Sequence, residues 1–174
     1  ELRSAIMGAG VAVGVVMFDA CAMAQVEIAH QFLGYADYIV FSQNMGRRCG
    51  CPYDTIMARL VAEPTMTDLD FAIVATDEFA LYYEVNNLSL CTMSVFDMSC
   101  TTAVAIAVGT FASEMVATMS TNYNTYTACG LRADEIGAAV DLMSFAELVS
   151  ASMTVSTTVS SAAAAVVGAV DVAI

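Results

Sequence analysis

The hydrophobic pattern of the chain opens with an unbroken apolar run over residues 11–18 that is rich in valine. Runs of this length are typical of strands that are buried on both faces of a parallel sheet. Residues 22–33 then place apolar side chains near helical spacing, and residues 37–42 form a second buried run. The pattern therefore predicts a β-α-β unit over residues 11–42, with a loop that leaves the first strand at Cys21.

The remaining pattern is mostly helical. The predicted helices cover residues 53–62, 68–84 (capped by Thr67), 97–119 and 145–170, the predicted strand covers 88–95, and irregular segments cover 43–52 and 122–132. The class is therefore α/β, with a sheet flanked by helices and a helix-rich C-terminal half.

Composition and charge narrow the function classes. Hydrophobic residues make up 59% of the 174 residues and charged residues only 13%, but no apolar run is read as a membrane span, since residues 11–18 fall far short of about 20 residues. No signal peptide is read at the start of the chain. The net charge of -13, with no lysine, disfavours binding to nucleic acid and suits basic peptide substrates.

Cys21 lies where functional groups gather in open α/β sheets, at the carboxyl end of the first predicted strand. At the N-terminus of the following helix, its thiolate would be stabilised by the helix dipole, and backbone N–H groups there could bind an oxyanion. The only histidine, His30, lies nine residues further on, about 13 Å along a helix. It is not expected to reach Cys21, so the thiol is either structural or has a partner elsewhere.

The other five cysteines form no recognisable metal site. Cys49 and Cys51 are separated by a single residue, which is tighter than zinc pairs, and a second pair is missing. Cys91, Cys100 and Cys129 are interpreted as small buried side chains. A metal-binding or redox role for Cys49 and Cys51 is the least favoured interpretation, and no metal site is predicted.

Four spaced motifs favour a functional role for Cys21 over a structural one. Residues 18–23 read Phe-Asp-Ala-Cys-Ala-Met, and they are followed by Val-Glu-Ile-Ala at 26–29, Tyr-Ala-Asp-Tyr-Ile-Val at 35–40 and Pro-Tyr-Asp at 52–54. In this order they resemble the clostripain family of cysteine peptidases. The resemblance implies a caspase-like (caspase-hemoglobinase) fold. Residues 1–95 would form its nucleophile-bearing part and residues 96–174 a helix-rich C-terminal part.

The resemblance also implies which residues take part in catalysis and substrate binding. Cys21 would be the nucleophile of an endopeptidase, and the base would be a His followed by Gly in a segment before it, often a cleaved light chain that stays associated. The N–H of Cys21 and that of this Gly would hold the oxyanion. Asp19 resembles the acidic residue that favours cleavage after Arg or Lys, and a carboxylate there can pair with a cationic side chain. Its alternative role is to cap the following helix.

Further expectations follow from the family. The enzyme would be secreted by a bacterium and would act on peptides or proteins with basic residues. Calcium dependence occurs in the family, although no Asp/Glu cluster indicates a dedicated oxygen-ligand site, and the sequence itself requires no cofactor.

Several positions depart from the family pattern. Met17 stands where Gly is preferred, Ala22 where a larger apolar residue is preferred, Cys51 where Trp is usual, and Cys49 where an Asp can assist basic specificity. These departures, and the absence of lysine and tryptophan, are either genuine or errors of sequence assignment. If they are genuine, they weaken the prediction that the enzyme cleaves after Arg or Lys, but not the prediction that Cys21 is the nucleophile. The alternative is a non-catalytic caspase-like scaffold or binding module in which Cys21 is structural.

Overall fold

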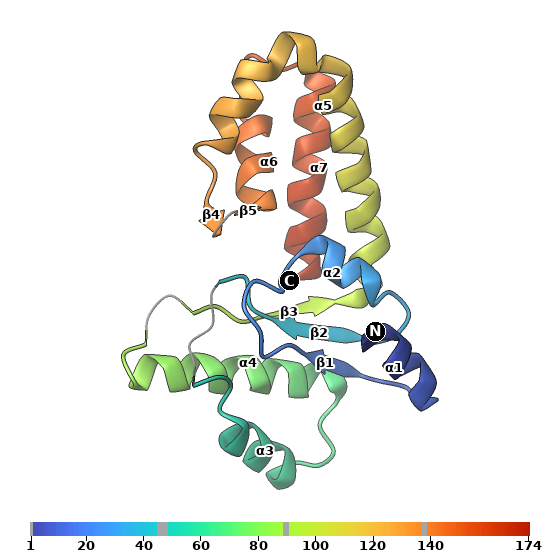
Figure 1. Ribbon diagram of the computed structural model, residues 1–174, viewed down its shortest axis with the longest axis vertical. Coiled ribbons are helices and arrows are strands. Elements are labelled where there is room, and N and C mark those ends of the chain that lie inside the picture. Colours follow the sequence, from blue (N-terminus) through green and yellow to red (C-terminus); the bar gives the residue numbers. More distant parts are fainter. Residues whose placement is uncertain (1, 45–48, 89–90, 137–138) are drawn as a thin grey trace. The chain divides into compact units, whose positions relative to one another are not determined.

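The computed structural model describes residues 2–44, 49–88, 91–136 and 139–174 (Figure 1). Its elements are α1 Leu2–Ala9, β1 Val15–Met17, α2 Val26–Gln31, β2 Tyr38–Phe41, α3 Tyr53–Ala62, α4 Asp68–Val85, β3 Ser94–Asp97, α5 Thr101–Gly130, β4 Glu135–Ile136, β5 Ala139–Val140, α6 Leu142–Ser150 and α7 Thr157–Ala173, with a 3-10 turn at Met98–Cys100. The class is mixed α/β, as predicted, and the structure is mostly helical with a small three-stranded sheet. The chain divides into two compact units, Glu1–Ser99 with Ile174 and Cys100–Ala173, and the functional division after residue 95 stays a prediction.

The sheet of the first unit contains the predicted β-α-β unit. β1 and β2 are parallel, with Val15 opposite Tyr38 and Met17 opposite Val40, and β3 runs antiparallel to β2. Helix α4 packs across all three strands, and α3 packs on α4, on its far side from the sheet (Figure 1). The predicted helix over residues 53–62 is confirmed, and the predicted helix over 68–84 is confirmed to within one residue.

The first strand is shorter than the apolar run that predicted it. Gly14 breaks the run, and its carbonyl accepts hydrogen bonds from the N–H groups of Asp37 and Tyr38, at 3.0 and 2.9 Å. A Cβ at position 14 would run into the carboxylate of Asp68. A larger residue at position 14 would therefore displace the Asp68 side chain where the chain enters β1, and Val11, before it, is exposed.

The strand predicted over residues 88–95 begins later than expected. Leu88 instead closes helix α4, because its N–H donates to the carbonyl of Tyr83 at 2.8 Å while Asn87 takes the left-handed conformation with φ 53°. This is the hydrogen-bond pattern of a Schellman helix end. Residues 89 and 90 lie outside the described residues, and β3 covers only Ser94–Asp97.

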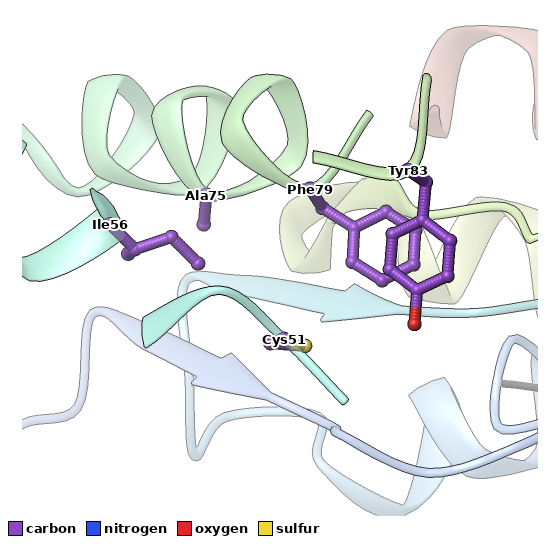
Figure 2. Packing of buried hydrophobic residues seen from close by; sticks show 5 residues of the cluster. All are labelled: Cys51, Ile56, Ala75, Phe79 and Tyr83. Atoms are coloured by element: carbon purple, nitrogen blue, oxygen red, sulfur yellow. The ribbon is translucent and has the colours of Figure 1, made fainter. Parts of the chain in front are cut away.

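The core of the first unit is built on one face of α4. Phe79 and Tyr83 stack with ring centroids 4.2 Å apart, and Figure 2 shows both rings projecting from α4 towards the segment that carries Cys51. Ile56, from α3, is fully buried in the same cluster. Burial of a side chain of this size contributes roughly 1.5 to 3 kcal/mol, so this cluster fixes α4 and α3 relative to the 49–53 segment.

In the second unit, α5 is longer than predicted. The predicted irregular connection over residues 122–132 is wrong for residues 122–130, because helix α5 continues to Gly130. Residues with low helix propensity there are held by packing, since Tyr126 and Cys129 are buried. The hydroxyls of Thr118 and Tyr126 lie 2.6 Å apart, although a straight helix would separate their Cα atoms by about 12 Å. The helix therefore bends, as Figure 1 shows.

The single helix predicted over residues 145–170 is also wrong, because α6 and α7 are separate helices. The break falls in a run of serine and threonine, where hydroxyls compete for backbone groups. Ser160 Oγ donates to the carbonyl of Ser150 at 2.7 Å, and the hydroxyls of Thr125 and Thr154 lie 2.8 Å apart. Both α5 and α6 pack against α7.

One continuous helical stretch, Met98–Gly130, is long and apolar enough to cross a membrane by length and composition alone, with a mean hydropathy of 1.5 over 18 residues. The expectation that no apolar segment reaches this length is wrong by that criterion. In this structure the same stretch bends and packs along α7.

The N-terminus of α4 provides a test of local stability. Thr67 Oγ1 accepts from the N–H of Asp70 at 3.1 Å, and the Asp70 carboxylate accepts from the N–H of Thr67 at 3.1 Å, which is a capping box. Thr67→Ala should lower the free energy of unfolding by about 1 kcal/mol, measured by urea denaturation. Thr65→Ala, at an exposed turn position two residues earlier, is the matched control, and an equal loss in both variants would contradict the capping role.

Candidate active site

Cys21 is exposed and lies beside a small pocket of about 60 Å³ in the first unit. The pocket is lined by side chains from both strand ends, α4 and the segment before β3: Phe18, Asp19, Ala20, Cys21, Ser42, Phe79, Tyr83 and Met93. The two site residues predicted from the sequence, Asp19 and Cys21, therefore share one pocket.

The parallel pairing of β1 and β2 explains this meeting. The N–H of Phe18 donates to the carbonyl of Val40 at 2.8 Å, which continues the pairing one residue past β1. Because the carboxyl ends of parallel strands lie at the same edge of a sheet, Asp19 and Ser42 leave the sheet together. The strand-end argument for the position of the site is consistent with this geometry.

The prediction that a helix begins directly after Cys21 is wrong. Helix α2 begins at Val26, five residues further on, so its dipole does not start at the thiol. The N–H groups of Ala22 and Ala24 donate to the carbonyls of Asn44 and Ser42, at 3.1 and 3.0 Å. These two donors hold the loop against the end of β2 and are not available for an oxyanion.

The loop that carries Cys21 has one unusual backbone position. Ala22 has φ 54°, which is uncommon for a residue with a side chain and costs of order 1 kcal/mol or more. Besides its N–H bond to Asn44, its carbonyl accepts from Gln25 Nε2 at 2.9 Å. The surrounding hydrogen bonds thus impose a conformation that turns the chain sharply just after Cys21.

Asp19 is held by the segment of residues 49–53. Its Oδ2 accepts from the N–H of Cys51 at 3.3 Å and from the hydroxyl of Tyr53 at 3.1 Å. The alternative role as a helix cap does not apply, because the N-cap of α2 is Gln25 and no side chain caps that helix. The carboxylate is therefore fixed at the rim of the pocket by two neutral donors.

Gly50 lets this segment approach the carboxylate closely. Its φ of 63° is in the left-handed region, and a Cβ at this position would lie 2.7 Å from Asp19 Oδ2. Both the conformation and the contact favour glycine at this position.

The aromatic and thiol groups around Asp19 favour their neutral forms. Burial, together with the charge of Asp19 and a hydrogen bond to it, raises the pKa of Cys51 from 9.0 to about 12. Burial and the hydrogen bond to Asp19 likewise raise the pKa of Tyr53 to about 12. Burial, followed by its hydrogen bond with Cys49, also raises the pKa of Tyr83. Cys51 is therefore not a reactive thiol at neutral pH.

No histidine lines the pocket among the described residues. His30 lies on α2 and is exposed, and since the sequence contains one histidine, the chain offers Cys21 no imidazole at the pocket. In the described part of the chain, no group of three or more His, Cys, Asp or Glu side chains is arranged to hold a metal ion.

Four pocket residues were missed by the sequence analysis. Ser42 could have been found, because it follows the second predicted parallel strand as Asp19 follows the first. Phe79 and Tyr83 share the buried face of α4 with Ala72 and Ala75, but apolar spacing alone does not say what a helix face meets. Met93 lies before β3 in a segment with no regular pattern.

The raised pKa values predict a loss of stability in alkaline solution. A group whose pKa is raised by folding stabilises the protein fully below its ordinary pKa and loses this contribution as the pH rises through the folded value. The free energy of unfolding should therefore fall between about pH 9 and pH 12, as Cys51 and Tyr53 ionise.

Urea denaturation under reducing conditions at a series of pH values measures this slope. Cys51→Ala and Tyr53→Phe should each flatten it, whereas Tyr123→Phe, at an exposed position of α5, should not. An unchanged slope in Cys51→Ala would contradict burial of the thiol as its source.

Solved structures of proteases resemble this chain. A clostripain from Bacteroides thetaiotaomicron in complex with a peptide inhibitor is 24% identical, with a TM-score of 0.52, over 61% of this chain and 45% of its own. A cysteine protease from B. fragilis is 22% identical, with the same coverage and TM-score. An inactive protease zymogen from Parabacteroides distasonis is 19% identical, with a TM-score of 0.66, over 99% of this chain and 45% of its own.

At these identities the likeness is one of fold, and the chain spans less than half the length of these three proteins. A comparison with curated proteins finds no match.

The family comparison covers almost the whole sequence. The model of the Clostripain family matches residues 1–173, which includes the strand end, the loop with Cys21 and the 49–53 segment. The resemblance indicated by the spaced motifs is thereby confirmed, and the chain belongs to the Clostripain family.

Proposed function

We propose that the chain is the nucleophile-bearing part of a cysteine endopeptidase in which Cys21 attacks the scissile carbonyl. The observation that carries the proposal is the exposed position of Cys21 at a strand-end pocket in a member of the Clostripain family. An exposed thiol beside a pocket is accessible to a peptide, whereas a structural cysteine is usually buried.

The general base would come from outside this sequence. The family resemblance implies a His-Gly in a segment or light chain that precedes Cys21, and the only histidine here, His30, is not part of the pocket lining. The open edge of β1 supports such an arrangement: in the described part of the chain, β1 pairs only with β2. A further strand beside β1 would extend the sheet towards a fuller caspase-like arrangement, which we also propose.

The reaction would proceed by acyl transfer. The histidine takes the proton of the Cys21 thiol, and the thiolate attacks the scissile carbonyl carbon to form a tetrahedral oxyanion. The C–N bond then breaks, the histidine protonates the leaving amine, and a thioester remains. Water attacks the thioester with the histidine as base, which releases the acid product and restores the thiol. The resemblance assigns the oxyanion to the N–H of Cys21 and that of the Gly after the histidine.

Asp19 would select substrates with Arg or Lys before the cleaved bond. Its Oδ2 accepts from Cys51 and Tyr53, and the residue is exposed at the pocket, so the carboxylate can receive a cationic donor. The apolar walls formed by Phe18 and Phe79 suit the aliphatic stem of such a side chain. A related clostripain binds a peptide inhibitor, which supports peptides as the substrate class.

Location and ion dependence are inferred from relatives. A related protease from Bacteroides thetaiotaomicron is secreted, and we extend secretion to this protein. Calcium dependence stays a prediction from the family.

The alternative function is a non-catalytic scaffold in which Cys21 is structural. The occupied N–H groups of Ala22 and Ala24 and the late start of α2 favour it, because they remove two of the features that would activate the thiol.

Affinity labelling tests the nucleophile. The chain together with its His-bearing segment should be labelled stoichiometrically by an arginyl or lysyl chloromethyl ketone, and mass spectrometry should locate the label on Cys21. Cys21→Ala should abolish both labelling and hydrolysis, because no other thiol shares the pocket.

Cys49 is an internal control in this experiment, because it is also exposed and remains present in Cys21→Ala. A folded protein that contains the His-bearing segment and takes up no label would favour the scaffold. Labelling of Cys49 in place of Cys21 would refute the assignment of the nucleophile.

Substitution of the pocket carboxylate tests specificity. Asp19→Asn keeps the shape of the side chain and removes its charge, so kcat/KM for substrates with Arg before the cleaved bond should fall roughly 10- to 100-fold, the value of a charge-assisted hydrogen bond. Cleavage of a matched substrate with a neutral residue should change little. Asp54→Asn, at an exposed carboxylate in the first turn of α3, is the control, and an equal loss in both variants would argue against Asp19.

A further inference from the structure

We propose that Tyr83 is a positioning residue that fixes residues 49–53 and, through them, the carboxylate of Asp19 at the pocket. The inference rests on the proposed function, in which Asp19 selects a cationic substrate side chain. No sequence motif pointed to Tyr83, which lies 64 residues after Asp19 on a different element, α4.

The Tyr83 hydroxyl contacts two residues of the 49–53 segment. The Tyr83 hydroxyl donates to the carbonyl of Gly50 at 3.2 Å and accepts from Cys49 Sγ at 3.4 Å. The Tyr83 side chain is almost fully buried, at 4% exposed, so its hydroxyl has few other partners. One hydroxyl thus ties two consecutive residues of the segment to α4.

The same segment also contacts the carboxylate of Asp19. Gly50, which accepts from Tyr83, also lies against Asp19 Oδ2, and the next residue, Cys51, donates its N–H to that oxygen. Tyr53 donates to the same oxygen from the start of α3. The segment is therefore held by Tyr83 on one side and holds Asp19 on the other.

The Tyr83 ring is held in place by neighbouring aromatic rings. Phe79 stacks on it with ring centroids 4.2 Å apart, and Figure 2 shows the two rings beside Cys51 of the same buried cluster. The ring of Tyr82 meets it edge-on at 5.5 Å. Ring pairs in these arrangements stabilise each other beyond burial alone. The hydroxyl therefore has a fixed position from which to orient the segment.

Loss of this hydroxyl has a specific consequence. Tyr83→Phe leaves the Gly50 carbonyl and the Cys49 thiol without their partner but keeps the stacked ring, so the core is preserved while the segment is released. The two donors to Asp19 then lose their fixed positions. Recognition of the cationic side chain by Asp19 should therefore weaken.

The experiment compares Tyr83→Phe with the parent protein, each assembled with the His-bearing segment, on paired peptides with Arg or a neutral isostere before the cleaved bond. We expect KM for the Arg peptide to rise, so that the ratio of kcat/KM for the Arg peptide to kcat/KM for the neutral peptide falls about three- to tenfold. Tyr82→Phe is the matched control, since its hydroxyl has no hydrogen bond within the described residues. Equal effects in the two variants, or an unchanged ratio in Tyr83→Phe, would overturn the proposal.

A second readout does not depend on activity. Alkylation of Cys51, which is 6% exposed, should be several-fold faster in Tyr83→Phe than in Tyr82→Phe, because the segment that buries it is released. If the parent protein neither cleaves nor takes up label at Cys21, the proposed function fails, and alkylation alone decides the positioning role. Equal alkylation rates would then refute it.

Discussion

The candidate site depends on the register of two short parallel strands. Met17 lies opposite Val40, and the hydrogen bond from Phe18 to Val40 brings the loop with Cys21 out of the sheet beside Ser42. A slip of one residue would exchange the faces of every side chain in β1. The burial of Phe18 against Phe32, with ring centroids 5.4 Å apart, opposes such a slip. The position of the thiol is thus decided by backbone pairing and by one aromatic contact before any catalytic group is considered.

At this edge of the sheet, uncharged donors orient the charged carboxylate of Asp19. Asp19 is fixed by a backbone N–H and a phenol, and no arginine of the described residues bridges to it. Neutral donors orient the carboxylate without cancelling its charge, so its field remains available to a cation, in a chain of net charge -13. One of the two donors, Cys51, belongs to the buried cluster on α4, so its N–H has a fixed position from which to orient the carboxylate.

The parts of the fold that follow from local rules could be predicted, and those that depend on contacts between distant residues could not. The β-α-β unit and helices α3 and α4 follow from apolar spacing and from the cap at Thr67. The continuation of α5 through residues 122–130 depends on buried Tyr126 and Cys129, which spacing does not reveal. At the site, strand ends and motifs indicate Asp19 and Cys21. The role of Tyr83 depends on how α4 meets residues 49–53, and no local pattern encodes that meeting.

The close approach of Gly50 to Asp19 also limits how this site can evolve. A side chain at position 50 would meet Asp19 Oδ2 at 2.7 Å, so residue 50 cannot gain a side chain unless the carboxylate moves. Positions 19 and 50 are therefore coupled, although they lie on different segments of the chain. A substitution at one of them changes which residues are tolerated at the other.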